Sequence, residues 1–211
     1  MKILAHRGIW NNSMEMNSLH SLASSFDLDI GIETDVRDCD GKLVISHDPP
    51  LASCALQFDV LLQAYMARPT RPLLALNIKS DGLQARLLAA LQHHGVENYF
   101  VFDMSVPDTL GYQRLQMPFA ARISEYEPHN VLAEKAPWIW LDAFHDEWFS
   151  IETIRSWLDQ GKSVAVVSPE LHRRSHKALW AVLLSLQAED QLYLCTDYVH
   201  NAQEYFDVSK N

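Results

Sequence analysis

The sequence predicts an α/β protein: a single (β/α)8 TIM barrel with a β-hairpin extension after its second strand. Eight apolar segments read as strands, and most of them are followed by a segment with helical spacing of apolar residues. The strand segments are rich in β-branched and aromatic residues, as in parallel sheets buried on both faces. A chain of 211 residues is near the small end for this fold. No linker, repeat or low-complexity segment interrupts it, so residues 1–211 are predicted to form one domain.

The elements follow in a regular order. Strands are expected at 2–5, 32–37, 73–78, 99–104, 119–123, 138–143, 163–167 and 192–195, with a return strand at 42–46 that forms the hairpin. Helices are expected at 17–27, 58–66, 83–93, 107–116, 128–136, 151–160, 174–187 and 201–208. An open doubly wound sheet is the alternative, but no GxGxxG turn follows the first strand, which weakens a dinucleotide-binding interpretation.

Several candidate catalytic and metal-binding residues lie close together in the predicted hairpin. Glu33 and Asp35 are two residues apart, so an extended backbone points both carboxylates to one face. Asp40-Gly41 has the residue types of a tight turn, and the return strand ends at His47. Two carboxylates and a histidine in one hairpin predict a metal-assisted acid–base site.

The composition excludes some classes of function. A formal net charge of −10, without a run of Lys or Arg, argues against nucleic-acid binding. No segment approaches the roughly 20 apolar residues that a membrane helix needs. The odd number of cysteines, Cys39, Cys54 and Cys195, favours free thiols in a reducing compartment. With no signal-peptide pattern at the N-terminus, these features predict a cytoplasmic protein.

Polar side chains follow the apolar runs at the same end of each predicted strand, where a barrel gathers its active-site residues. Each has a structural alternative on its own; an aspartate after a strand, for example, often caps the next helix. The joint pattern favours function. The residues are His6, Arg7, Glu33, Asp35, His47, Asn77, Lys79, Asp103, Arg122, Glu125, Asp142, Ser168, Thr196 and Asp197.

Three motifs resemble those of the glycerophosphodiester phosphodiesterase family. They are HisArgGly at 6–8, IleGluThrAspVal at 32–36 and AspGlyLysLeuValIleSerHisAsp at 40–48. Weaker matches lie at 17–19, 77–79 and 196–198, so the resemblance spans most of the chain in order. The family is a TIM barrel, which agrees with the strand count.

The resemblance implies a role for each matching residue. His6 and His47 would be the catalytic acid–base pair, and Glu33, Asp35 and Asn77 would bind a divalent metal, Mg²⁺ or Ca²⁺. Arg7 and Lys79 would hold the phosphate of a small-molecule phosphodiester. Oxygen ligands suit a hard cation that bridges to phosphate, and histidine exchanges protons near neutral pH.

The chain departs from the family pattern at three places. Asn77 stands where a third metal-binding glutamate is expected, and Met16 stands where the family has another glutamate. The segment after Asp48 is short and lacks most of the family's usual insertion, which predicts a more open mouth. Arg122 and Asp142 are predicted to bind the substrate there, beside aromatic residues that suit a sugar or polyol group.

The sequence leaves several functions open. The first is hydrolysis of a glycerophosphodiester-like substrate, through a cyclic phosphate in the resembled family. A lyase that releases the cyclic phosphate is a second, and a non-catalytic barrel that binds a phosphorylated metabolite is a third. A zinc hydrolase is disfavoured because no clustered Cys/His ligand set occurs. The oligomeric state is not specified by the sequence.

Overall fold

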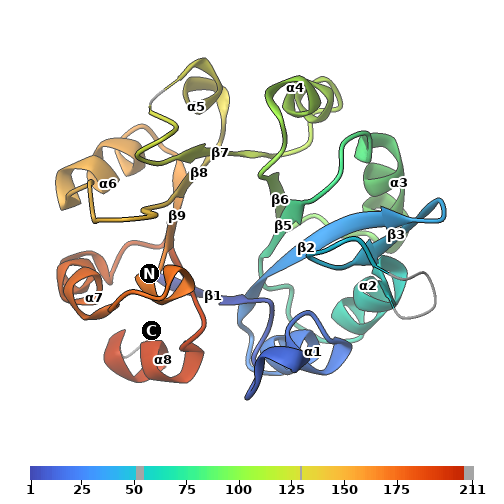
Figure 1. Ribbon diagram of the computed structural model, residues 1–211, viewed down its shortest axis with the longest axis horizontal. Helices are drawn as coiled ribbons and strands as arrows, with labels where there is room; N and C mark the ends of the chain where they lie inside the picture. Colours follow the sequence, from blue (N-terminus) through green and yellow to red (C-terminus); the bar gives the residue numbers. More distant parts are fainter. Residues whose placement is uncertain (51–54, 129, 207–211) are drawn as a thin grey trace. The chain divides into compact units, whose positions relative to one another are not determined.

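The computed structural model describes residues 1–50, 55–128 and 130–206. Within these ranges eight strands are each followed along the chain by a helix, in the predicted order (Figure 1). The strands are β1 Lys2–His6, β2 Gly31–Cys39, β3 Lys42–Ile45, β4 Leu56–Gln57, β5 Leu74–Ile78, β6 Tyr99–Phe102, β7 Ala120–Ile123, β8 Trp138–Leu141, β9 Ser163–Val167 and β10 Leu192–Thr196; β3 and β4 extend β2. The helices are α1 Leu19–Asp27, α2 Phe58–Met66, α3 Gln84–His94, α4 Val106–Arg114, α5 Val131–Lys135, α6 Ile151–Leu158, α7 Lys177–Leu183 and α8 Val199–Phe206.

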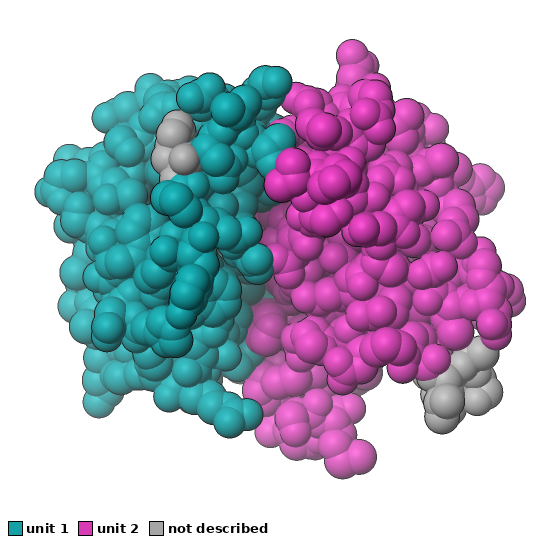
Figure 2. All heavy atoms as spheres, turned by 45° about the horizontal axis from the view of Figure 1, so that its top comes forward, with its two compact units in different colours: residues 1–5, 120–211 teal, residues 6–119 magenta. Residues whose placement is uncertain are grey.

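The chain divides into two compact units, coloured separately in Figure 2. Unit 1 contains residues 1–5 and 120–211, and unit 2 contains residues 6–119. In unit 1, β1, β10, β9, β8 and β7 pair in that order, and all four pairings are parallel. In unit 2, β2 pairs in parallel with β5, which pairs in parallel with β6. The single domain inferred from the sequence stays a prediction.

The hairpin of unit 2 has the predicted turn. β2 pairs antiparallel with β3, with Cys39 opposite Lys42. Asp40 and Gly41 both have positive φ, 48° and 78°, the backbone of a turn that follows the twist of the two strands. On its other side β2 sets Asp35 opposite Asn77 of β5, so two predicted site residues lie on adjacent strands.

Helix ends differ from the prediction where a local backbone conformation stops the helix. α1 begins at Leu19, because Asn17 has φ 59° and Ser18 is the cap that accepts from the Ser21 N–H at 3.1 Å. The helix predicted from Arg174 begins only at Lys177. It is preceded by a 3-10 turn, Pro169–His172, that Arg173 ends with φ 60°. The two-residue strand β4 was not predicted, because a segment this short carries no periodic pattern.

Each unit buries its own apolar side chains, which come from both the strands and the covering helices. Phe26, Phe58, Leu61 and Leu76 are almost fully buried in unit 2, and Trp180 is almost fully buried in unit 1. Among the described residues, none of the helices is long and apolar enough to cross a bilayer. In the part of the chain that the structure describes, Cys39 and Cys195 are not joined in a disulfide bond. Cys54 lies outside the described residues.

Candidate active site

The first part of the site is the turn that follows β1. Arg7 and Gly8 both have positive φ, and the Arg7 N–H donates to the Glu33 carbonyl at 2.9 Å. A Cβ on Gly8 would lie only 2.5 Å from the carbonyl carbon of Ser21, so only glycine fits here without moving the backbone. The turn therefore fixes His6 and Arg7 beside β2.

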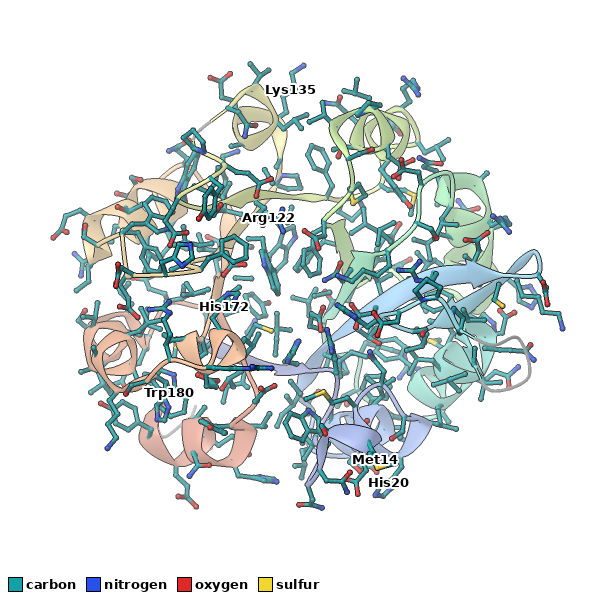
Figure 3. The ribbon with its side chains drawn as sticks, viewed as in Figure 1. Met14, His20, Arg122, Lys135, His172 and Trp180 are labelled. Carbon is teal, nitrogen blue, oxygen red and sulfur yellow. The ribbon has the colours of Figure 1, made fainter. Side chains whose placement is uncertain are left out.

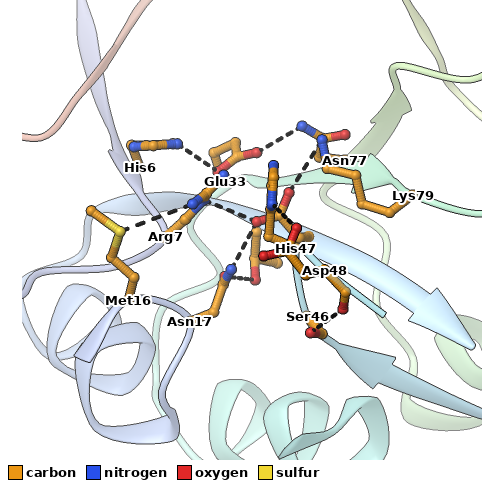
Figure 4. A network of polar contacts seen from close by, with 12 residues as sticks. His6, Arg7, Met16, Asn17, Glu33, Ser46, His47, Asp48, Asn77 and Lys79 are labelled. Carbon is orange, nitrogen blue, oxygen red and sulfur yellow. Dashed lines mark hydrogen bonds and ion pairs between the residues drawn. The ribbon is translucent and has the colours of Figure 1, made fainter. Parts of the chain in front are cut away.

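Asp35 contacts Arg7, Asn17 and Lys79, three residues that Figure 4 labels. Its side chain is fully buried, and its Oδ2 lies 2.9 Å from the Nε of Arg7. The same oxygen accepts a hydrogen bond from Asn17 at 2.8 Å. The other oxygen, Oδ1, lies 3.4 Å from the Nζ of Lys79, which also contacts Asp103 at 3.3 Å. One buried carboxylate thus holds both cations that the sequence predicts to bind phosphate.

Glu33 lies two residues away and is also buried. Burial is the largest cause that raises the pKa of Glu33, to about 6, and the negative charge of Asp35 adds to it. The positive charges of His6 and Arg7 and a hydrogen bond from Asn77 act in the opposite direction. His6 Nε2 lies 3.9 Å from Glu33 Oε2, and Asn77 donates to Glu33 Oε1 at 3.1 Å.

His47 follows the return strand β3. The main chain before it is tied to β2, because the Ser46 N–H donates to the Asp35 carbonyl at 3.0 Å. The His47 side chain is about half exposed, and its Nδ1 lies 2.9 Å from Asp48 Oδ1. In the view of Figure 4, His6 lies to the left of Arg7 and Glu33, and His47 lies to their right. The hairpin therefore holds the backbone next to His47 against Asp35, while the His47 side chain contacts Asp48.

The oxygen atoms between β2 and β5 fit a hard divalent cation. Glu33 Oε2 and Asn77 Oδ1 are buried and accept no hydrogen bond in the described structure. Buried acceptors without a partner are costly unless a ligand or water satisfies them. Both are hard oxygen donors of the kind that Mg²⁺ and Ca²⁺ prefer. The described residues contain no cluster of three His, Cys, Asp or Glu side chains suited to a metal, and position 77 supplies an amide oxygen rather than a carboxylate.

The remaining predicted residues lie in unit 1 and make contacts there. Arg122, on β7, forms an ion pair with Glu127 and lies 5.8 Å from the ring centre of Phe144. Asp142 follows β8 and is buried. It accepts a hydrogen bond from the Ala143 N–H at 2.8 Å and lies 2.7 Å from His172 Nε2. Figure 3 labels Arg122 and His172.

Glu125, which the sequence places among the strand-end polar groups, supports a loop. Its carboxylate accepts hydrogen bonds from the backbone N–H groups of Phe144 and His145 at 3.1 and 2.9 Å. Slight burial raises the pKa of Glu125, but these backbone hydrogen bonds outweigh it and bring the pKa to about 2. Trp138 packs on Tyr193 with ring centres 5.1 Å apart, which is a packing contact within the sheet.

Three residues in or near these networks were missed from the sequence. Asn17 was interpreted as the start of a helix and as part of the weak motif match at 17–19, without a role in the site, although its amide contacts Asp35. His172 lies in a 3-10 turn that was not predicted. Glu170 is buried and accepts hydrogen bonds from the hydroxyl groups of Ser168 and Thr196, so those two strand-end residues serve a buried carboxylate.

Searches against family models and against curated proteins found no match. The fold, in contrast, matches solved structures. A candidate glycerophosphodiester phosphodiesterase from Galdieria sulphuraria matches with a TM-score of 0.79 and 20% sequence identity, over 98% of this chain and 97% of that chain. The glycerophosphodiester phosphodiesterase from Agrobacterium tumefaciens matches with a TM-score of 0.71 and 18% identity, over 100% of both chains.

A third similar structure is an Oleispira antarctica phosphodiesterase solved in complex with its product, sn-glycerol-3-phosphate. Its TM-score is 0.70 and its identity 16%, over 98% of this chain and 97% of that chain. At such low identity the likeness describes the fold alone. It agrees with the order of strands and helices and with the resemblance carried by the three sequence motifs. The chain has the fold of the glycerophosphodiester phosphodiesterases.

Proposed function

We propose that this chain is a divalent-metal-assisted phosphodiesterase that acts on a glycerophosphodiester-like substrate, with His6 and His47 as the acid–base pair. The observation that carries the proposal is the arrangement around Asp35, where one buried carboxylate contacts two cations. His6 lies 3.9 Å from Glu33 Oε2, and Ser46, the residue before His47, hydrogen-bonds to the Asp35 carbonyl. Arg7 and Lys79 supply the positive charge that a phosphodiester needs in a protein with a net charge of −10.

In this mechanism Arg7 binds the phosphoryl oxygens through its guanidinium, and Lys79 adds a second positive charge. One histidine takes the proton from the attacking hydroxyl, and the other gives a proton to the leaving alkoxide. Glu33, Asp35 and Asn77 would hold the metal, which supplies charge neutralisation at the phosphoryl oxygens.

The test of the acid–base pair is the loss of turnover in single variants. We expect His6→Ala and His47→Ala each to lower kcat on an aryl phosphodiester by about 10²- to 10⁴-fold, the usual contribution of a positioned acid or base. His20→Ala is the matched control, because His20 is exposed on α1 of the same unit. Full turnover in either site variant, with Mg²⁺, Ca²⁺ or Mn²⁺ present, would contradict the acid–base roles assigned to His6 and His47.

The metal site predicts the effect of adding a carboxylate at position 77. We expect Asn77→Glu to bind Mg²⁺ about tenfold more tightly, because a charged oxygen ligand replaces a neutral one. Isothermal titration calorimetry measures the affinity. Asn98→Glu adds the same charge at an exposed position of unit 2 and is the control. Equal Mg²⁺ affinity in the two variants would contradict a metal bound by residue 77.

A second function is favoured by one specific observation. Asp35 already lies between two cations: Arg7 and Asn17 contact Oδ2, and Lys79 Nζ lies 3.4 Å from Oδ1, at ion-pair distance but without a hydrogen bond. A chain that binds a phosphorylated metabolite without a metal would use the same cations. Calorimetry with inorganic phosphate in a chelating buffer separates the two. Strong phosphate binding, together with no Mg²⁺ binding at millimolar concentration, would favour the binding protein.

The enzyme also has two chemical outcomes. A hydrolase gives an open phosphate monoester, whereas a lyase stops at a cyclic phosphate that the substrate's own hydroxyl forms. Phosphorus NMR of the reaction mixture distinguishes them, because the two products have different chemical shifts. We propose the hydrolase, and a cyclic phosphate that accumulates without further conversion would show the lyase instead.

A further inference from the structure

We infer that Asn17 is a positioning residue that sets the orientation of the Asp35 carboxylate, and through it the places of Arg7 and Lys79. This inference rests on the proposed phosphate-binding role of those two cations. Asn17 Nδ2 and Arg7 Nε meet on the same oxygen, Asp35 Oδ2, at 2.8 and 2.9 Å. The oxygen left for Lys79 is then Oδ1, at 3.4 Å. A rotation of the carboxylate would change both contacts together.

Thr34 fixes which end of the Asn17 amide faces Asp35. The Thr34 hydroxyl donates to Asn17 Oδ1 at 2.7 Å, so the NH2 group is the end that reaches the carboxylate. An ionised carboxylate only accepts hydrogen bonds, which makes this the one satisfactory orientation of the amide. Thr34 is fully buried on β2, between Glu33 and Asp35. The amide is therefore held at both ends by one strand.

The backbone of Asn17 closes the arrangement. Asn17 has φ 59°, in the left-handed region that asparagine tolerates better than most residues. Its N–H donates to the carbonyl of Arg7 at 3.0 Å. Asn17 thus contacts the main chain of Arg7 and, through Asp35, the Arg7 side chain. Hydrogen bonds and an ion pair therefore connect the Arg7 segment and the Asn17 segment to each other and to β2.

The Asn17 side chain is not needed to begin the helix that follows. Ser18 is the cap of α1, and its hydroxyl accepts the Ser21 N–H at 3.1 Å. Both ends of the Asn17 amide are hydrogen-bonded to side chains of β2. The Asn17 side chain lies just before α1 but hydrogen-bonds to Asp35 and Thr34. We therefore assign its role to the candidate site and not to the helix cap.

The experiment compares Asn17→Gly with Asp29→Gly. Both positions have positive φ, 59° and 56°, so glycine relaxes the same backbone conformation in each variant. Asp29 is exposed in the same unit. The first readout is the ¹⁵N NMR signal of the Arg7 guanidinium. We expect it to shift in Asn17→Gly and to stay unchanged in Asp29→Gly. An unchanged signal in Asn17→Gly would overturn the inference.

The second readout is the affinity for inorganic phosphate. We expect Asn17→Gly to weaken it about tenfold, the usual effect of one lost hydrogen bond to a charged group. In turnover, KM should rise by a similar factor while the pH profile of kcat keeps its shape, because the histidines are unchanged. A shifted Arg7 signal in a protein that binds no phosphate would support the positioning role and reject the proposed function, so the two failures are distinct.

Thr34→Val is the second variant, in case Asn17→Gly does not fold. It removes only the hydroxyl that orients the amide, at nearly constant volume. We expect it to shift the Arg7 signal in the same direction as Asn17→Gly. In the double variant the effects on phosphate affinity should be less than additive, because both residues act through one amide. A wild-type Arg7 signal in Thr34→Val, or full additivity, would count against the arrangement.

Discussion

At the scale of single residues, Glu33 links the site to the stability of the protein. Its pKa is raised to about 6 by burial and by Asp35, so the folded protein holds the Glu33 proton more tightly than the unfolded chain does. The stability that protonated Glu33 contributes is present below the unfolded pKa, near 4.5. It is lost as the pH rises through about 6. Ionised Glu33 therefore destabilises the metal-free protein at neutral pH.

We expect Glu33→Gln to remove this pH dependence. In a chelating buffer, the unfolding free energy of Glu33→Gln relative to wild type should rise by about 2 kcal/mol between pH 4.5 and pH 7.5, at about 1.4 kcal/mol for each pKa unit. Denaturant unfolding at both pH values measures it. Glu97→Gln, exposed in the same unit, controls for the loss of a carboxylate. A constant difference between variant and wild type would contradict the raised pKa.

Most of the proposed site could be predicted from single residues, because they follow apolar strands. His6, Arg7, Glu33, Asp35 and Lys79 stand out as polar groups after buried segments. Asn17 could not be recognised in this way. An asparagine before a helix is typical of a cap, and its contact with Asp35 depends on a left-handed backbone that no periodic pattern reveals.

At the scale of elements, the turn after β1 depends on Gly8. Gly8 has φ 88° and a Cβ there would collide with the backbone of Ser21, whereas Gly41 has φ 78° with nothing within 4 Å. We expect Gly41→Ala to cost about 1 kcal/mol of unfolding free energy and Gly8→Ala to cost at least about 2 kcal/mol more. Chemical denaturation of both variants measures the difference.

The Gly8 comparison isolates the backbone collision, because both glycines have positive φ and differ only in what a new methyl group would contact. Gly8→Ala should also weaken phosphate binding, since α1 and the segment that carries Arg7 must separate. An equal loss of unfolding free energy in Gly8→Ala and Gly41→Ala would mean that the turn after β1 can shift to accommodate the new methyl group.

The elements themselves were predicted well where their signals are local. The Asp40-Gly41 hairpin turn is present, because it depends on a few adjacent residues. The helix expected from Arg174 was wrong in its first turn. Arg174 instead donates to the carbonyl of Ala143 and contacts Glu147 at 2.9 Å. A short window of sequence does not predict such long-range contacts.

At the scale of the whole molecule, the alternation of strands and helices was enough to predict the (β/α)8 fold. Similar structures share only 16–20% of their residues with this chain, so the pattern of buried strands persists where most identities do not. Strand pairing could not be predicted in the same way. The register that sets Asp35 opposite Asn77 depends on packing between distant segments, which one sequence does not specify.

The carboxylate of Asp35 has a consequence for how such a site can change over evolution. Its partners Arg7, Asn17 and Lys79 come from three separate segments of the chain. Loss of Asp35 alone would remove the carboxylate that the two cations share and leave Lys79 with Asp103, and loss of either cation would leave a buried charge under-compensated. A single substitution among these four residues is therefore costly, and we expect it to be tolerated best together with a second substitution that restores the charge balance.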